Sequence, residues 1–237
     1  MINLNQQPPE KPTCRTDGAV EVTEVFFTLQ GEGPLAGVPA VFVRLSGCNL
    51  QCPDCDTDYT SRRQFVPSKA LVEMVDQVRR DAEVTSGKKV VVLTGGEPFR
   101  QDVAEVCARL MYAGYHVQIE TNGTLYRADM PWYGNLSVVC SPKTSTVAEG
   151  LRPYVKALKY VLEDGKVDND GLPLTTISNL RPQRPWDGFK GEVYVQPADM
   201  GPGQAEQNKR NLDAAVRSCL KHGYRLSVQL HKIVGLP

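Results

Sequence analysis

The sequence contains no apolar run that approaches the roughly 20 residues a helix needs to cross a bilayer. It also has no net charge, because 27 basic residues balance 27 acidic ones. A neutral chain creates no field that favours nucleic acid or a membrane surface, so we expect a small molecule as its partner. Residues 1–12 are polar and lack the apolar segment of a secretory signal, which indicates a cytoplasmic location.

A disulfide framework is not indicated either. Seven cysteines are an odd number, and a reducing compartment uses cysteines for metal binding or packing. Three of them fall within one short segment, Cys48-Asn49-Leu50-Gln51-Cys52-Pro53-Asp54-Cys55. Three thiolates on one loop can ligate three irons of a cubane iron–sulfur cluster and leave the fourth iron open for a non-protein ligand. An open iron indicates chemistry at the cluster rather than electron transfer alone.

A zinc site is the main alternative for this loop. The C-x3-C-x2-C spacing differs from the C-x2-C pairs of common zinc sites, but Cys14 or Cys140 could supply a fourth ligand. The three cysteines could also be unpaired thiols. Spacing alone therefore favours the cluster but leaves zinc and free thiols open. Cys107 and Cys219 lie on apolar faces of expected helices, and we interpret them as core residues.

Strands and helices alternate along much of the chain. Residues 1–20, rich in Pro, Gln and Asn, predict a mobile tail, and residues 21–237 predict a single domain. Strands are expected at 40–45, 89–93, 115–120, 136–140, 157–162, 192–196 and 225–230, and helices after an N-cap at Ser68, at 102–113 and at 204–221. This order favours right-handed βαβ units and a parallel sheet. Six or seven strands predict an α/β fold, an incomplete, open TIM-like (β/α) barrel.

Two segments carry more specific expectations. Residues 163–190 are polar, contain Pro173, Pro182 and Pro185, and are expected to form an insertion or a lid. In the last long helix, we expect an inward face made of Leu212, Ala215, Val216, Cys219 and Leu220.

Polar residues follow several expected strands at their carboxyl ends. Besides the cysteine loop, they are Thr94-Gly95-Gly96-Glu97-Pro98, Glu120-Thr121-Asn122-Gly123-Thr124, Ser141-Pro142-Lys143 and Gln196-Pro197-Ala198-Asp199. Each motif alone is weak, because a Gly-Gly pair is commonly a turn and Ser-Pro-Lys a solvated loop. A parallel α/β barrel builds its active site at this end, so we expect the five segments to surround one pocket.

These motifs suit a ligand that carries an ammonium group and a ribose. Gly95 and Gly96 would let an ammonium group approach backbone carbonyls, and Glu97 could offset its charge. Glu120 and Asn122 offer acceptors and donors for ribose hydroxyls. The Ser-Pro-Lys motif could hold a carboxylate or an adenosyl group. Together they predict a site for S-adenosylmethionine (SAM) beside the cluster.

The motifs together resemble those of the 7-carboxy-7-deazaguanine synthase family, radical SAM enzymes of queuosine and 7-deazapurine biosynthesis. The resemblance runs from about residue 26 to residue 237. It includes Leu29-Gln30-Gly31-Glu32-Gly33, Gly37-Val38-Pro39, residues 42–50, Cys55-Asp56-Thr57, the motifs given above for three later strands, and residues 231–237. The cysteine spacing is that of the superfamily. The Gln-Gly-Glu-Gly segment and the final His-Lys-x-x-Gly-x-Pro are specific to the family.

The resemblance implies a reaction and its cofactors. It implies an α/β partial barrel of the radical SAM type that converts 6-carboxy-5,6,7,8-tetrahydropterin to 7-carboxy-7-deazaguanine, with ring contraction and loss of ammonia. The cofactors would be a [4Fe-4S] cluster, SAM used catalytically, and Mg2+. Because the radical arises on SAM, no catalytic residue is assigned. The partners would be the pterin, an electron donor such as flavodoxin or ferredoxin, and a second copy in a homodimer; no nucleic acid and no membrane are expected.

The resemblance also implies roles for individual residues. The cluster ligands would be Cys48, Cys52 and Cys55, and the hydroxyl of Thr57 would bind Mg2+, a hard cation that prefers oxygen. The pterin would contact Leu29, Gln30, Gly31, Glu32, Arg44, Thr94, His231 and the carboxylate of Pro237. SAM would contact Asp54, Gly96, Glu97, Glu120, Asn122, Ser141, Pro142, Lys143, Gln196, Pro197, Ala198 and Asp199. Asp54 stands where many radical SAM loops have an aromatic residue, so side-chain stacking on adenine is not expected there.

Two other functions fit the cysteine loop. An activating enzyme that makes a glycyl radical on a partner protein shares the cysteine spacing and a similar barrel, but it needs an open groove for a protein loop. A zinc-stabilised binding module would not be an enzyme.

Overall fold

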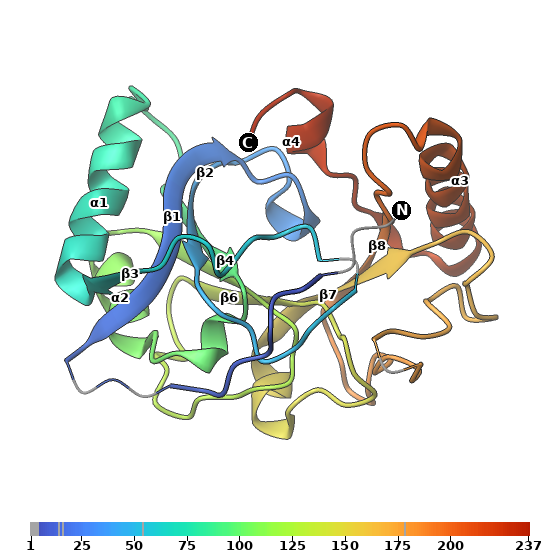
Figure 1. The fold of residues 1–237 in the computed structure, drawn as a ribbon, viewed down its shortest axis with the longest axis horizontal. Helices are drawn as coiled ribbons and strands as arrows, with labels where there is room; N and C mark the ends of the chain where they lie inside the picture. The colour runs from blue at the N-terminus through green and yellow to red at the C-terminus, as the bar shows by residue number, and fades with distance from the viewer. Residues whose placement is uncertain (1–4, 14, 16, 54, 178) are drawn as a thin grey trace.

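One nine-stranded sheet forms the centre of the computed structural model, which describes residues 5–13, 15, 17–53, 55–177 and 179–237 (Figure 1). The order of its strands is β3-β1-β2-β4-β5-β6-β7-β8-β9. The strands are β1 (Ala19–Leu29), β2 (Pro39–Leu45), β3 (Gln64–Pro67), β4 (Val90–Gly95), β5 (His116–Thr121), β6 (Leu136–Cys140), β7 (Val155–Leu162), β8 (Glu192–Pro197) and β9 (Arg225–Leu226).

Most of the sheet is parallel. Strands β2 and β4 to β9 pair in parallel, whereas β1 pairs antiparallel with both β2 and β3. In the described part of the chain, β3 and β9 each have one neighbour, so the sheet stays open. This confirms the incomplete, open TIM-like barrel, with the carboxyl ends of its parallel strands at one edge.

Three helices of the described chain cover the outer face of the sheet, namely α1 (Ser68–Asp81), α2 (Ala104–Tyr112) and α3 (Ala205–His222). The short α4 (Leu230–Ile233) contacts β1 instead. Short 3-10 segments are η1 (Gly33–Leu35), η2 (Pro98–Arg100) and η3 (Glu149–Tyr154). Helices α1 and α2 contact each other near one end of the sheet, and α3 packs on β8 near the other (Figure 1). None of the described helices is both apolar enough and long enough to span a bilayer.

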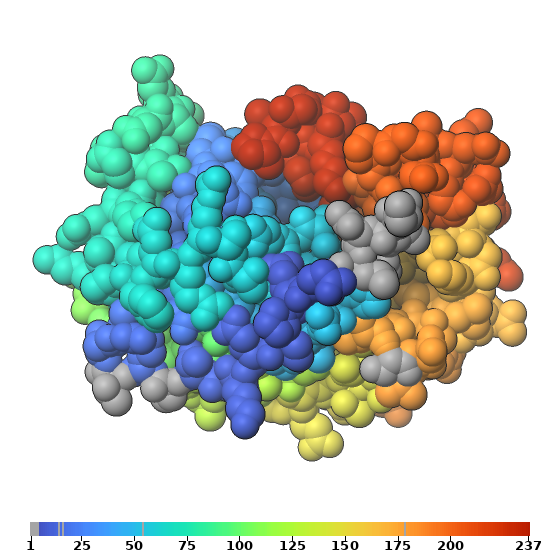
Figure 2. All heavy atoms as spheres, in the orientation of Figure 1, coloured from blue at the N-terminus to red at the C-terminus, as the bar shows by residue number. Residues whose placement is uncertain are grey.

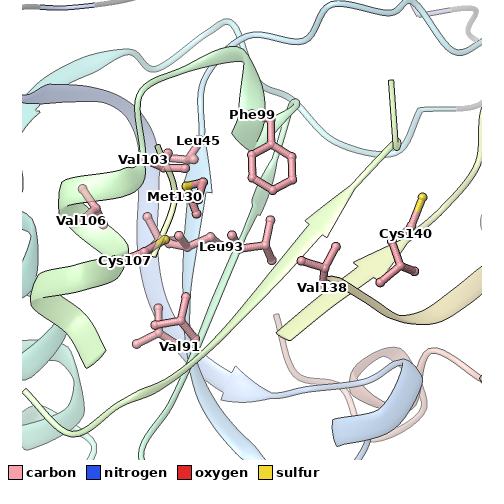
Figure 3. Close-up of a cluster of buried hydrophobic side chains, with 14 of the residues drawn as sticks. Leu45, Val91, Leu93, Phe99, Val103, Val106, Cys107, Met130, Val138 and Cys140 are labelled. Atoms are coloured by element: carbon pink, nitrogen blue, oxygen red, sulfur yellow. The ribbon is translucent and has the colours of Figure 1, made fainter. Parts of the chain in front are cut away.

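The main core lies between the sheet and these helices. Leu45 and Leu93 extend from β2 and β4 toward Val106 and Cys107 of α2, and all four are buried (Figure 3). β-Branched residues dominate these strands because they suit a pleated, buried surface. The alternate residues point to the inner face of the sheet, away from α1 and α2. Cys107 is therefore a core residue as predicted, while Cys219 is only partly buried against the core.

The inward face of α3 differs from the prediction. Leu212 is 37% exposed and Leu220 is 83% exposed, although both were expected to point inward. The helix instead buries polar residues that bind loop backbone: the amide of Asn211 donates to the carbonyl of Ala198 at 2.8 Å, and Ser218 donates to the carbonyl of Gly171 at 2.5 Å. Ala215 is buried as predicted and Cys219 packs against the core, so the prediction was wrong for Leu212 and Leu220, and the two hydrogen bonds help to set the rotation of the helix.

Two boundaries of secondary structure also differ from the prediction. Ser68 is the first residue of α1 rather than its N-cap, and its hydroxyl donates to the carbonyl of Gly18 at 2.6 Å. The strand predicted at 225–230 is only Arg225–Leu226, and Leu230 already begins α4. The described residues of 163–190 form no helix; they are tied down by ion pairs, as between Arg184 and Asp170 at 2.7 Å. A lid function for this segment stays a prediction.

A buried guanidinium connects several segments. Arg100 of η2 is 1% exposed and forms ion pairs with Glu21 of β1 and, at 3.2 Å, with Glu10. It also donates to the carbonyl of Ser46, just beyond β2, at 2.9 Å. The neighbouring amide of Gln101 donates to the same carbonyl at 3.0 Å. These contacts fix the start of the cysteine loop against the core.

Replacing this arginine should destabilise the fold. Arg100→Met removes the buried cation of Glu21 and leaves that carboxylate only the more exposed Arg63, 3.2 Å away, so we expect the free energy of unfolding to fall by about 3 kcal/mol. Arg109→Met is the matched control, since Arg109 forms a half-exposed ion pair with Glu105 within α2 and should cost less than about 1 kcal/mol. Urea denaturation measures both, and equal losses in the two variants would contradict the role of Arg100.

Candidate active site

A row of polar side chains crosses the inner face of the sheet near its carboxyl edge. Arg44 of β2 lies opposite Thr94 of β4, and the hydroxyl of Thr94 donates to the carboxylate of Glu120 on β5 at 3.2 Å. The other carboxylate oxygen of Glu120 accepts from the amides of Gln30 at 2.8 Å and Gln118 at 3.3 Å. The structure thus brings two expected pterin residues, Gln30 and Thr94, onto a carboxylate that was expected near SAM.

An ion pair that the sequence did not reveal lies in the same row. Lys159 of β7 binds Glu32, and their side chains are only 13% and 12% exposed. Burial opposes the charge of each group, but their attraction prevails, so the pKa of Glu32 is lowered and the pKa of Lys159 is raised. Glu120 and Asp56 also favour the charge of Lys159. In the sequence, Lys159 looks like an ordinary polar residue of an alternating strand, so only its position among buried neighbours identifies it.

The last residues of the chain close over the end of β1 (Figure 1). His231 packs against Gly31 so closely that a Cβ on Gly31 would lie 2.0 Å from the ring Nδ1. The backbone N–H of Leu230 donates to the carbonyl of Gly31 at 3.1 Å. The hydroxyl of Thr28 donates to a backbone oxygen of Pro237 at 2.8 Å. Three expected pterin residues, Gly31, His231 and Pro237, therefore lie together, and burial lowers the pKa of His231.

The cysteine loop brings its thiols near one another at the carboxyl edge. Cys48 is buried, and Cys52 and Cys55 are partly exposed. Burial, followed by the charges of Glu97 and the other two cysteines, raises the pKa of Cys48 to about 12, against a hydrogen bond from the N–H of Leu50. Three thiolates placed this closely repel one another, so a cationic group that takes up their charge would stabilise the loop. The loop therefore fits a metal cluster.

A single zinc ion fits the loop less well. In the described part of the chain, no three His, Cys, Asp or Glu side chains converge closely enough to hold one metal ion. Thiolates on one tetrahedral zinc lie roughly 3.8 Å apart, given Zn–S bonds of about 2.3 Å, whereas cubane ligands bind three different irons and stand farther apart. Cys140 is buried against Gly123, and Cys14 lies outside the described residues. Three thiols suit a cluster with one open iron better than a structural zinc ion, which takes four protein ligands.

Arg44 and Thr57 share a cleft of about 290 Å3 beside the cysteine loop. Arg44 donates to the carboxylate of Glu24 at 2.6 Å and to the hydroxyl of Thr57 at 3.2 Å. The hydroxyl of Thr57 also lies 3.3 Å from a carboxylate oxygen of Asp56. One hydroxyl and two carboxylates are the hard oxygen ligands that Mg2+ prefers, so the expected Mg2+ ligand has suitable neighbours.

Gly96 and Glu97 of the Thr-Gly-Gly-Glu-Pro motif make contacts within the protein. A Cβ on Gly96 would lie 1.8 Å from the carbonyl oxygen of Gly47, so the missing side chain allows two backbones to pack. Glu97 is fully buried and accepts from the N–H of Phe99 at 2.9 Å, the hydroxyl of Thr121 at 2.8 Å and the N–H of Asn122 at 2.8 Å. Glu97 therefore joins the start of η2 to the end of β5, and its expected role of offsetting a ligand's charge stays a prediction.

The other residues expected around SAM fall into two groups. One group lies toward the cysteine loop or β7 and consists of Asn122, Ser141, Pro142 and Lys143. The amide of Asn122 donates to Asn49 at 2.9 Å, and Ser141 donates to the carbonyl of Lys159 at 3.0 Å. Burial raises the pKa of Cys55, and the charge of Lys143 acts in the opposite direction. Pro197 ends β8, and Ala198 and Asp199 follow it. Asp199 pairs with Lys232 at 2.7 Å. Asp54 lies outside the described residues.

One buried polar atom at this edge has no partner. The side-chain oxygen of Gln196 is buried, and no described group donates to it. Because an unsatisfied buried acceptor is costly, this oxygen is suited to a ligand that brings its own donor. Gln196 is thus the member of the β8 motif best suited to contact a bound molecule.

The titration of Glu97 should be visible in the stability of the apoprotein. Burial raises its pKa to about 7, against three hydrogen bonds that lower it. A raised carboxyl pKa means that the folded state binds the proton more tightly than the unfolded state, so this contribution to stability is complete below about pH 4.5 and is lost as the pH rises to about 7. Relative to Glu97→Gln, which cannot titrate, the free energy of unfolding of the wild type should therefore fall over this range. A difference that is flat or rises with pH would contradict the assignment.

Comparison with known proteins agrees with this geometry. Residues 42–134, which include the cysteine loop, match the Radical SAM superfamily. A 7-carboxy-7-deazaguanine synthase from Rhodospirillum rubrum is 44% identical over 98% of this chain and 99% of that protein. Another from Halobacterium salinarum is 49% identical over 90% of this chain and 89% of that protein.

A solved structure agrees on the fold. The crystal structure of QueE from Escherichia coli superposes with a TM-score of 0.64, covering 90% of this chain and 95% of that one at 24% identity. The fold is therefore shared, and the level of identity to the two synthases, over nearly their whole length, shows that the chain belongs to the 7-carboxy-7-deazaguanine synthase family of the radical SAM superfamily.

Proposed function

We propose that this protein is a lyase that converts 6-carboxy-5,6,7,8-tetrahydropterin to 7-carboxy-7-deazaguanine with loss of ammonia. The observation that carries the proposal is the meeting of three distant segments at one edge of the sheet: the cysteine loop, the Gln-Gly-Glu-Gly segment and the C-terminal residues. His231 packs on Gly31, and Lys232 lies 3.7 Å from Asp56 of the cysteine loop. Thiols for a cluster thus stand beside amide, hydroxyl and carboxylate groups for a polar heterocycle.

The cysteine loop would hold the redox group. Cys48, Cys52 and Cys55 would ligate a [4Fe-4S] cluster, and the cluster with SAM would supply the radical that starts the reaction. Lys143 lies close enough to favour the thiolate of Cys55. The unpartnered oxygen of Gln196 would accept a hydrogen bond from SAM. The protein's own contribution is to orient the two ligands and exclude water.

The inner-face row would orient the pterin. Glu120 binds the side chains of Gln30 and Thr94, so both are fixed in direction before a ligand arrives. Lys159 keeps Glu32 ionised, and an ionised carboxylate can only accept hydrogen bonds. The pterin carries N–H donors along its guanidine-like edge, which makes this carboxylate a suitable partner.

The substrate carboxylate would bind in the cleft of Arg44 and Thr57. The planar fork of an arginine matches a carboxylate in two parallel hydrogen bonds. Arg44 now binds Glu24, so a bound substrate would exchange one carboxylate for another at the same guanidinium. Mg2+ at the hydroxyl of Thr57 would offset the added negative charge.

The C-terminal residues favour a small substrate over a protein. They cover the end of β1, where an activating enzyme would need an open groove. The remaining parts of the proposal, namely a homodimer, reduction by flavodoxin or ferredoxin and a cytoplasmic location, are supported by the family resemblance alone.

An anaerobic assay tests the function. The reconstituted protein receives SAM, reductant, Mg2+ and the pterin, and mass spectrometry follows 7-carboxy-7-deazaguanine. We expect product in excess of SAM consumed, and less of it without Mg2+. SAM cleavage without this product would leave a radical SAM enzyme with another substrate, as in the activating-enzyme alternative. Bound zinc and no SAM cleavage would indicate the binding module.

The buried ion pair should be required for turnover. Lys159→Met leaves Glu32 without its cation, so the carboxyl group takes up a proton and loses an acceptor. We expect kcat/KM for the pterin to fall about 100-fold or more, which corresponds to roughly 2.7 kcal/mol or more. Lys156→Met is the matched control, because Lys156 lies exposed on the same strand. Similar kinetics for the two variants would argue against a role for Lys159.

A further inference from the structure

The first described residues lie against the cysteine loop. Figure 2 shows the dark blue atoms of the N-terminal segment in contact with the blue-to-cyan atoms of the segment that follows β2. The sequence predicted a mobile tail here, and residues 5–13 contain no helix or strand. Their contacts are nevertheless numerous and specific, and they involve side chains as well as backbone.

Carbonyl groups of the cysteine loop find their donors in this segment. The N–H of Glu10 donates to the carbonyl of Cys48 at 2.7 Å. The side-chain amide of Asn5 donates to the carbonyl of Cys52 at 3.2 Å, and its backbone N–H donates to that of Pro53 at 3.3 Å. A loop outside regular secondary structure must find such partners elsewhere. Two of the three expected cluster ligands thus have their backbone oxygens held by residues 5–10.

The side chain of Gln7 binds the chain just beyond the third cysteine. Its amide N–H donates to the carbonyl of Thr57 at 2.8 Å, and its oxygen accepts from the N–H of Tyr59 at 2.7 Å and the hydroxyl of Thr60 at 3.2 Å. Asn5 supports this amide, since its side-chain oxygen accepts from the side-chain N–H of Gln7 at 3.1 Å and from the backbone N–H of Gln7 at 2.9 Å. One amide thus satisfies both a donor and an acceptor of the loop.

The other end of the segment is fixed to the core. The N–H of Thr13 donates to the carbonyl of the buried Arg100 at 2.7 Å, and Glu10 lies 3.2 Å from the guanidinium of Arg100. Glu10 also forms an ion pair with Arg63. Because Arg100 binds the start of the cysteine loop as well, one rigid group holds both the loop and the segment that crosses it.

We propose that residues 5–13 form a strap that positions the cysteine loop and restricts access of solvent to the group held by its thiols. Asn5 and Gln7 act as positioning residues, since they bind the loop backbone and not the cluster. Protection of a cluster by the strap rests on the proposed function, because it requires that the loop holds a cluster. Positioning of the loop does not, because the strap would order the loop in the apoprotein as well. The strap and the proposed function can therefore fail separately.

Thiol reactivity in the apoprotein tests the strap directly. Each net hydrogen bond is worth about 1 kcal/mol, or roughly a fivefold change in local opening. We therefore expect Asn5→Ala/Gln7→Ala to raise the rate at which iodoacetamide modifies Cys52 and Cys55 by about fivefold or more, read at each cysteine by peptide mass spectrometry. Gln77→Ala is the control, because its amide binds Asp81 on the exposed side of α1.

Cys107 provides an internal reference, since it is buried in the core and should stay slow in every variant. If it also becomes reactive, the double variant has unfolded, and the single variant Gln7→Ala replaces it. Wild-type reactivity of Cys52 and Cys55 in a folded variant would overturn the strap.

Iron release tests the functional half of the proposal. After anaerobic reconstitution, the strap variant should lose iron to a chelator about fivefold or more faster than the wild type or Gln77→Ala. Equal release rates would overturn the protective role even if thiol reactivity rises. A wild type that takes up no iron or sulfide would refute the proposed function instead, while the alkylation rates would still decide whether the strap orders the loop.

Discussion

The buried positive charge of Arg100 constrains much of the edge of the sheet that carries the candidate active site. Arg100 is surrounded by protein, and a buried guanidinium is tolerated only when carboxylates and carbonyls surround it. Glu21 and the carbonyl of Ser46 meet this need, so β1, the end of β2 and η2 must come together at one point. Gly47 follows with a φ of 76°, and a Cβ there would lie 2.6 Å from the guanidinium. A side chain at Gly47 would therefore displace the group that fixes the approach to Cys48.

The inner face is governed by a second buried cation. Lys159 lies among Glu32, Glu120 and Asp56, each of which favours its charge. Glu32 is the carboxylate that Lys159 binds directly, and this attraction lowers the pKa of Glu32 against the effect of burial. Glu32 therefore remains an acceptor, and the carboxylate of Glu120 already orients Gln30 and Thr94. The carboxyl end of this face is thus arranged to accept hydrogen bonds from a donor-rich ligand, above the apolar cluster of Ala40, Val90 and Val92 on the same face.

Local sequence patterns predicted the sheet well and the contacts between distant segments poorly. The strand at 136–140 was predicted with its observed bounds, because a buried β-branched run ends at a polar motif. Leu212 and Leu220 of α3 were wrongly expected to point inward, because polar Asn211 and Ser218 bind loop carbonyls and apolar periodicity does not register such bonds. Periodicity likewise gives no sign of the ion pair of Lys159 or of the hydrogen bonds made by residues 5–13. Amide side chains such as that of Gln7 are typical of disordered tails. They can also form hydrogen bonds with the backbone N–H and C=O groups of an irregular loop.

The cysteine loop illustrates why such a site depends on the whole chain. Its described residues form no helix or strand, so its conformation is set by contacts at and just beyond the loop: Glu10 before it in sequence, Asn122 beyond β5, and Lys232, which lies near Asp56. Closing contacts over such separations costs entropy, which only the completed fold repays. The loop can therefore be ordered only after the sheet has brought these segments together. We therefore expect the three thiols to become ordered in the last stage of folding and not before it. The conformation of the loop should then depend on the contacts made by both ends of the chain.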